Sequence, residues 1–152
     1  MKLQDFDFRI WNTACKKYID NISYSIKKYQ NKNKVFLPFS IDLSEYGDNE
    51  TFKDEIQMPS DRVEIELFTG FYDKKGNKIY EGDILYSFEG CSEDEAFKYK
   101  VVFKEGAFYL VECGDDGEEW DEDLLSEFCL EELEIVGNIH ENAELLNENK
   151  PS

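Results

Sequence analysis

Hydrophobic and polar residues alternate over much of this chain, which is the pattern of half-buried β-strands. Residues 6–11 show it first, because Phe6, Phe8 and Ile10 are separated by charged residues, and residues 63–68 repeat it. Successive side chains of a strand point to opposite faces, so a period of two gives each segment one mainly apolar face. Both segments are predicted strands.

Short turn segments divide the second half of the chain into further strands. The predicted strands there span residues 63–68, 79–80, 84–88, 98–103, 107–111 and 133–136. Lys104-Glu105-Gly106 is a short connection with a glycine available for positive φ, so 98–111 is predicted to be a hairpin. Four glycines at strand ends are predicted to be structural turn residues: Gly70, Gly76, Gly82 and Gly106.

The first 61 residues give weaker signals. Residues 18–30 fit both a strand and a helix, and we favour the strand. Residues 35–41 are apolar but contain Pro38, which predicts an edge strand or an extended segment. Residues 42–61 are polar and predict a long loop or linker.

These elements predict an all-β protein with one or two short helices. One short helix is expected at 124–129, where apolar residues recur at helical spacing, and another after Asn142, which can act as an N-cap. Repeated short strands with tight turns favour a small barrel. We expect an N-terminal basic β segment with a linker at 1–60 and an acidic barrel region with a short C-terminal helix at 61–152.

Composition is compatible with a folded protein despite a net charge of -18. Hydrophobic residues make up 41% of the 152 residues and aromatic residues 15%, which is above the level of disordered chains. No apolar run is long enough to span a bilayer. The four cysteines form no C-x-x-C pair and follow no secretory leader, so we expect reduced thiols, no zinc and a soluble, cytoplasmic protein.

Charge is divided unevenly along the chain. Residues 1–34 carry a net charge of +5 and the remaining residues -23, and the stretch 112–134 holds twelve carboxylates and no basic residue. That stretch could present an anionic surface to a basic protein partner. The candidate partner-binding residues are Asp115, Asp116, Glu118, Glu119, Trp120, Asp121 and Glu122.

The basic N-terminal part supports an alternative, contact with nucleic acid by charge and aromatic stacking. Its candidate residues are Lys16, Lys17, Lys27, Lys28, Lys32 and Lys34, which tyrosines interrupt. Two arguments oppose nucleic-acid binding. The negative net charge of the whole chain repels phosphate, and lysines on edge strands often serve only to prevent pairing with another strand.

Catalytic, cofactor and metal chemistry have little support in the sequence, and no catalytic residue, cofactor or metal ligand is predicted. His140 is the only imidazole, and no nucleophile motif surrounds it. Carboxylates beside Cys113 disfavour a reactive thiolate. Aligning residues 112–123 with a calcium-binding EF-hand loop places Gly114 at the third ligand position, so this ligand is missing. The glycine spacing from Gly70 to Lys78 does not match a phosphate-binding loop.

Four ordered segments resemble the YopX family of phage and prophage proteins. They are residues 69–85, which contain Ile79-Tyr80-Glu81-Gly82-Asp83-Ile84, residues 101–108, residues 133–142 and the opening Phe8-Arg9-Ile10-Trp11-Asn12. The chain departs from the family where His140 replaces a common tyrosine and Ala143 a common proline, so the last helix should fray more readily. The resemblance implies an all-β fold with a barrel region of SH3 type, in a protein of phage or prophage in low-GC Gram-positive hosts, and implies no activity.

The sequence therefore favours a non-enzymatic module that binds a protein partner through strand edges or its acidic surface. Nucleic-acid binding by the basic part is the alternative, and a metal-dependent hydrolase is the third hypothesis. The oligomeric state and the partner's identity stay open.

Overall fold

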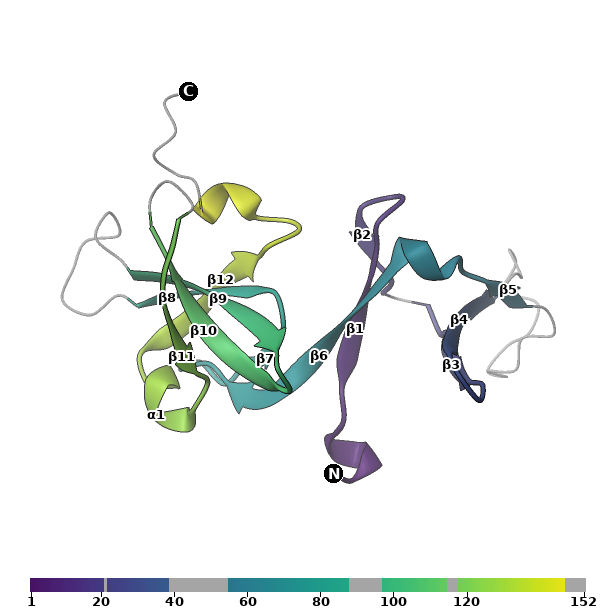
Figure 1. Cartoon of the computed structure of the whole chain (residues 1–152), viewed down its shortest axis with the longest axis horizontal. Coiled ribbons are helices and arrows are strands. Elements are labelled where there is room, and N and C mark those ends of the chain that lie inside the picture. The colour runs from purple at the N-terminus through teal and green to yellow at the C-terminus, as the bar shows by residue number, and fades with distance from the viewer. Residues whose placement is uncertain (21, 39–54, 88–96, 115–117, 147–152) are drawn as a thin grey trace. The chain divides into compact units, whose positions relative to one another are not determined.

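The computed structural model describes residues 1–20, 22–38, 55–87, 97–114 and 118–146 (Figure 1). The predicted all-β class is confirmed, because strands dominate the described residues and the helices are short. Residues 1–9 and 66–152 form one compact unit, and residues 10–65 form a second. None of the described helices has the length and apolar character that crossing a bilayer requires.

A five-stranded antiparallel sheet makes up most of the first unit. Its order is β11-β10-β9-β8-β12, and it is strongly curled (Figure 1). The strands are β8 (Asp83–Ser87), β9 (Phe97–Lys104), β10 (Ala107–Cys113), β11 (Glu119–Leu124) and β12 (Leu133–Asn138). Consecutive strands β8 to β11 are neighbours, so this part of the sheet is a meander.

The predicted hairpin of β9 and β10 is confirmed. Lys104 pairs with Ala107, and both residues between them have positive φ, +51° at Glu105 and +80° at Gly106. Two successive positive φ values give a turn whose twist matches that of the flanking strands. Glycine supplies one of them without steric cost, which is why the sequence could predict the turn.

The hydrophobic core of this unit lies on one face of the sheet. Its buried members are Ile79, Leu85, Val101, Leu110, Leu125, Leu130 and Leu133. Leu85, Val101 and Leu110 come from neighbouring strands, while Leu130 belongs to the short helix α1 (Glu127–Leu130). The predicted short helix is therefore present. The strand β11 before it was not predicted, because charged residues occupy most of its positions.

A second antiparallel pair joins this sheet through its turn. Strand β6 (Val63–Tyr72) pairs with β7 (Lys78–Tyr80), and β1 (Phe8–Asn12) lies on the other side of β6. The turn between β6 and β7 lies against the outer edge of β12, where the Lys74 N–H donates to the Leu133 carbonyl at 3.0 Å.

Asp73 fixes this turn to β12. Its buried carboxylate accepts hydrogen bonds from the backbone N–H groups of Lys75 (3.0 Å), Asn77 (2.8 Å) and Ile135 (3.0 Å). Burial by itself raises the pKa of Asp73, but the hydrogen bonds from these backbone groups outweigh it and hold the pKa below its usual value. The carboxylate therefore replaces missing sheet hydrogen bonds at this edge.

We expect Asp73→Asn to lower the free energy of unfolding by about 1–3 kcal/mol, because an amide leaves one of these buried N–H groups without an acceptor. Since the folded pKa of Asp73 is depressed, its contribution is present above the unfolded pKa and disappears as pH falls through the folded value. Urea denaturation at pH 7 and pH 3 measures both effects. A variant as stable as the parent at pH 7 would contradict the assignment.

The second unit contains a three-stranded sheet in the order β3-β4-β5, with β3 (Ser25–Lys28), β4 (Asn33–Pro38) and β5 (Glu55–Gln57). The strand favoured within 18–30 is confirmed at β3. The edge position expected for the segment containing Pro38 is wrong, because β4 is the middle strand. Pro38 is its last residue, so the missing N–H does not interrupt the sheet. The predicted loop at 42–61 contains β5, and its residues 42–54 lie outside the described residues.

Four shorter elements complete the described secondary structure. Strand β2 (Lys17–Tyr18) pairs with β1, and 3-10 turns span η1 (Leu3–Asp5), η3 (Ser60–Arg62) and η5 (Ala143–Leu146). The helix predicted after Asn142 is thus a single 3-10 turn.

Candidate functional site

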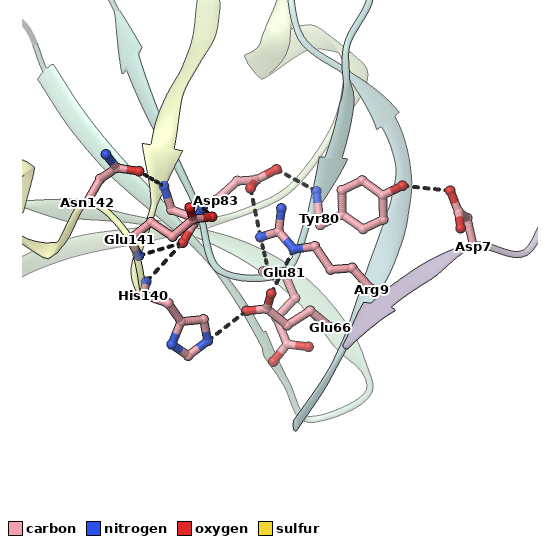
Figure 2. Close-up of polar contacts among 10 residues, drawn as sticks. Asp7, Arg9, Glu66, Tyr80, Glu81, Asp83, His140, Glu141 and Asn142 are labelled. Carbon is pink, nitrogen blue, oxygen red and sulfur yellow. Dashed lines mark hydrogen bonds and ion pairs between the residues drawn. The ribbon is translucent and has the colours of Figure 1, made fainter. Parts of the chain in front are cut away.

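Arg9 lies among buried carboxylates that come from distant parts of the chain (Figure 2). Its Nε–H donates to Glu66 Oε1 at 2.7 Å, and its Nη2 lies 2.9 Å from Asp83 Oδ1. The same Nη2 donates to the Glu81 carbonyl at 3.2 Å. The Glu66 and Asp83 side chains are only 6% and 3% exposed, so the guanidinium compensates two carboxylates that water scarcely reaches.

Tyr80 and His140 extend this cluster on two sides (Figure 2). The Tyr80 ring lies under the guanidinium, with its centroid 4.9 Å from Arg9 Cζ, and its hydroxyl donates to Asp7 at 2.6 Å. His140 Nε2 lies 3.2 Å from the second oxygen of Glu66. We call Arg9, Glu66, Tyr80, Asp83 and His140 the Arg9 cluster.

Backbone hydrogen bonds hold the parts of the cluster in register. Asp83 accepts from the Tyr80 N–H at 2.8 Å, which closes the tight turn between β7 and β8. The Asn138 side chain accepts from the N–H groups of His140 (3.0 Å) and Glu141 (2.9 Å), which shapes the turn after β12. The Ile139 N–H donates to the Gly82 carbonyl at 2.9 Å and connects the two turns.

Burial and close nitrogen neighbours set the electrostatics of the cluster. Burial raises the pKa of Asp83 to about 6, although Arg9 opposes the shift. One oxygen of Glu66 contacts the Arg9 guanidinium and the other lies beside the His140 imidazole, so each carboxylate oxygen has a nitrogen neighbour. Within the described ranges, no three His, Cys, Asp or Glu side chains converge in a way that could hold a metal ion.

The side chains of two of the four cysteines are described. Cys15 is exposed and Cys113 is buried, and both are free thiols. Burial raises the pKa of Cys113, which disfavours the thiolate that a nucleophile requires.

The predicted acidic candidates lie on and beside β11, the last strand of the five-stranded sheet. Glu119 and Glu122 form ion pairs with Lys100 and Lys104 of β9, across the intervening strand β10. Glu118 and Asp121 are exposed. Asp115 and Asp116 lie outside the described residues, and so does the side chain of Trp120.

The predicted basic candidates belong to the unit of residues 10–65. Lys27 forms an ion pair with Glu55 at 2.7 Å, and the Lys34 ammonium lies 4.8 Å from the centroid of Tyr29. Lys27 and Lys34 are register partners in β3 and β4. The others occupy β2, the end of β3 and turns: Lys16, Lys17, Lys28 and Lys32.

The four glycines predicted to occupy turns all have positive φ, between +80° and +87°. Gly82 is special among them. A Cβ there would lie 2.4 Å from Glu66 Oε2, whereas a Cβ at Gly70, Gly76 or Gly106 would meet no heavy atom within 4 Å. Gly82 therefore gives the Glu66 carboxylate the space it occupies in the Arg9 cluster.

Sequence reasoning missed the Arg9 cluster. It took Arg9 and Glu66 as polar positions of alternating strands, and Asp83 as part of a turn. The available signal was that Arg9, Asp83 and His140 each lie in a segment that carries the family resemblance.

Comparison with known proteins supports that resemblance. Residues 7–147 match the family described as YopX protein. No curated protein matches the chain.

Two solved structures have a similar fold. A crystal structure of protein EF1440 from Enterococcus faecalis has a TM-score of 0.57 and 21% identity, and the match covers 93% of this chain and 98% of that one. A crystal structure of protein yopX from Bacillus subtilis has a TM-score of 0.59 and 15% identity, covering 94% and 97%. At these identities the likeness concerns the fold.

Proposed function

This chain belongs to the YopX protein family, and on that premise we propose that it is a non-enzymatic protein-interaction module whose binding surface is the acidic edge strand β11. The observation that carries the proposal is the position of β11, which ends the five-stranded sheet with β10 as its neighbour on one side. An edge strand presents backbone donors and acceptors to which an extended segment of another chain can add.

The carboxylates of β11 favour a positively charged partner segment. Asp121 and Asp123 of β11 are exposed, and so is Glu118 directly before the strand. Glu119 and Glu122 form ion pairs with Lys100 and Lys104 of β9. A lysine- or arginine-rich strand beside β11 would gain Coulomb energy that a neutral strand lacks.

The same carboxylates oppose indiscriminate pairing. Asp123 stands opposite Leu110, a core residue, so a charge occupies a position on the face that carries the core. Charges at such positions on edge strands prevent edge-to-edge association of identical copies. A cationic partner strand is therefore favoured over a second copy of this chain at this edge.

The test is affinity capture of host and phage proteins by two variants with equal charge changes. In the first, Glu118, Glu119, Asp121 and Glu122 become Gln or Asn; in the matched control, Asp5, Asp20, Asp61 and Glu144 do. We expect partners to bind the parent and the control but not the β11 variant, and to be released at high salt, because the Debye length falls from about 10 Å at 0.1 M to about 3 Å at 1 M. Equal retention of the same partners by both variants would contradict the proposal.

Contact with nucleic acid through the lysines of residues 16–34 stays the alternative. The same capture distinguishes it, since nuclease treatment of the lysate would then remove the bound material.

A further inference from the structure

A surface hollow of about 600 Å³ lies where the end of β6 meets α1. Its lining residues are Gly70, Phe71, Tyr72, Asp73, Lys74, Glu127, Leu130 and Glu131. None of them belongs to the Arg9 cluster or to β11.

Aromatic and apolar side chains form part of its lining. Leu130 is buried and part of the core, Phe71 packs against that core, and Tyr72 is 51% exposed. The Tyr72 ring packs edge-on against Phe68, with centroids 5.6 Å apart, so its position is fixed although much of it faces water. A large exposed aromatic in a hollow is an energetic candidate for recognition.

A break in strand register lies beside the hollow. The pairing of β6 with β7 shifts between Phe68 and Tyr72, and Gly70 between them has a φ of +87°. No heavy atom lies within 4 Å of the place where a Gly70 Cβ would be. Such irregularities bend a strand and redirect its side chains, and they are frequent beside binding sites.

The charge available in the hollow is negative. Glu127 is the first residue of α1 and Glu131 is its C-cap, and both are exposed. Neither has an ion pair or hydrogen bond to another described residue. Asp73 is committed to three backbone N–H groups, and the Lys74 ammonium lies 3.5 Å from Glu134, a residue outside the lining.

We propose that this hollow binds a lysine or arginine side chain of a basic protein segment. A cation there meets the face or edge of Tyr72 and two carboxylates that lack a described partner, which is the combination that aromatic and acidic side chains use to recognise cationic groups. The inference rests on the proposed function, because it assigns a chemistry to the protein partner, but it uses residues separate from β11.

The test is a titration followed by backbone amide NMR shifts. The probe is the acetylated and amidated peptide Gly-Ser-Arg-Ser-Gly, and the matched peptide has Gln in place of Arg. We expect the Arg peptide to move the signals of Gly70–Lys74 and Glu127–Glu131, and the Gln peptide to move them much less. Equal shifts with both peptides, or shifts confined to β11, would overturn the assignment.

Variants separate this site from the β11 edge. The pair Glu127→Gln and Glu131→Gln should weaken Arg-peptide binding on the order of tenfold, as expected when two exposed charge pairs are lost. Tyr72→Leu keeps an apolar contact with Phe68 and should also weaken binding. The pair Asp121→Asn and Asp123→Asn should leave the affinity within about twofold.

Failure of either proposal can be recognised by itself. If the hollow variants bind the Arg peptide as the parent does, the cation site is wrong, whatever the capture experiment shows. If capture does not depend on β11 while the peptide titration behaves as expected, the β11 proposal is wrong and the cation site stands.

Discussion

Replacing Arg9 with methionine is expected to lower the free energy of unfolding at pH 7 by about 3–5 kcal/mol, because removing one partner leaves buried charges uncompensated. Arg9 contacts Glu66 at 2.7 Å and Asp83 at 2.9 Å, and both carboxylates are almost fully excluded from water. Urea denaturation followed by circular dichroism measures the change. Methionine retains much of the aliphatic length, so the loss reports mainly on charge.

The matched control is Arg62→Met, which makes the same chemical change at an exposed arginine. Its expected effect is within about 0.5 kcal/mol. If the two variants lose equal stability, Arg9 does not compensate the buried carboxylates.

The pH dependence of the Arg9 variant provides a second readout of the same prediction. Because burial raises the folded pKa of Asp83 to about 6 from 3.8, the stability linked to its protonation is complete below 3.8 and is lost as pH rises through about 6. Arg9 opposes this rise, so its removal raises the folded pKa of Asp83 further. The deficit of Arg9→Met should therefore shrink as pH is lowered from 7 to 5.

Gly82→Val is expected to destabilise the fold by about 3 kcal/mol or more, because two costs add there. A branched residue at a φ of +87° costs about 1–3 kcal/mol in backbone strain. In addition, the new Cβ would lie 2.4 Å from Glu66 Oε2, so the carboxylate must leave its position between Arg9 and His140. The measurement is again the free energy of unfolding in urea.

Gly76→Val separates these two costs. Gly76 has nearly the same φ, +84°, and no heavy atom within 4 Å of the Cβ position, so it carries the strain without the collision. We expect Gly82→Val to be clearly the less stable of the two. If Gly82→Val does not fold, Gly82→Ala and Gly76→Ala provide the same comparison with a smaller side chain. If the substitutions at Gly82 and Gly76 lower the free energy of unfolding equally, the collision with Glu66 does not contribute to the destabilisation.

The sequence determined the local structure of this protein, because local structure depends on patterns that a few residues carry. Alternating side chains between 63 and 68 indicated a strand, and Lys104-Glu105-Gly106 indicated the hairpin turn that the structure contains. The YopX resemblance came from ordered segments at both ends of the chain, and the family match over residues 7–147 agrees with it.

The tertiary structure decided which distant residues meet. Residues 1–9 join the compact unit of residues 66–152, which brings Arg9 to Glu66 and Asp83. Strand β11 forms although it is acidic, because pairing with β10 and the lysines Lys100 and Lys104 of β9 supports it. Backbone pairing and charge compensation across a sheet depend on residues that are far apart in the sequence, so no local sequence pattern predicts them.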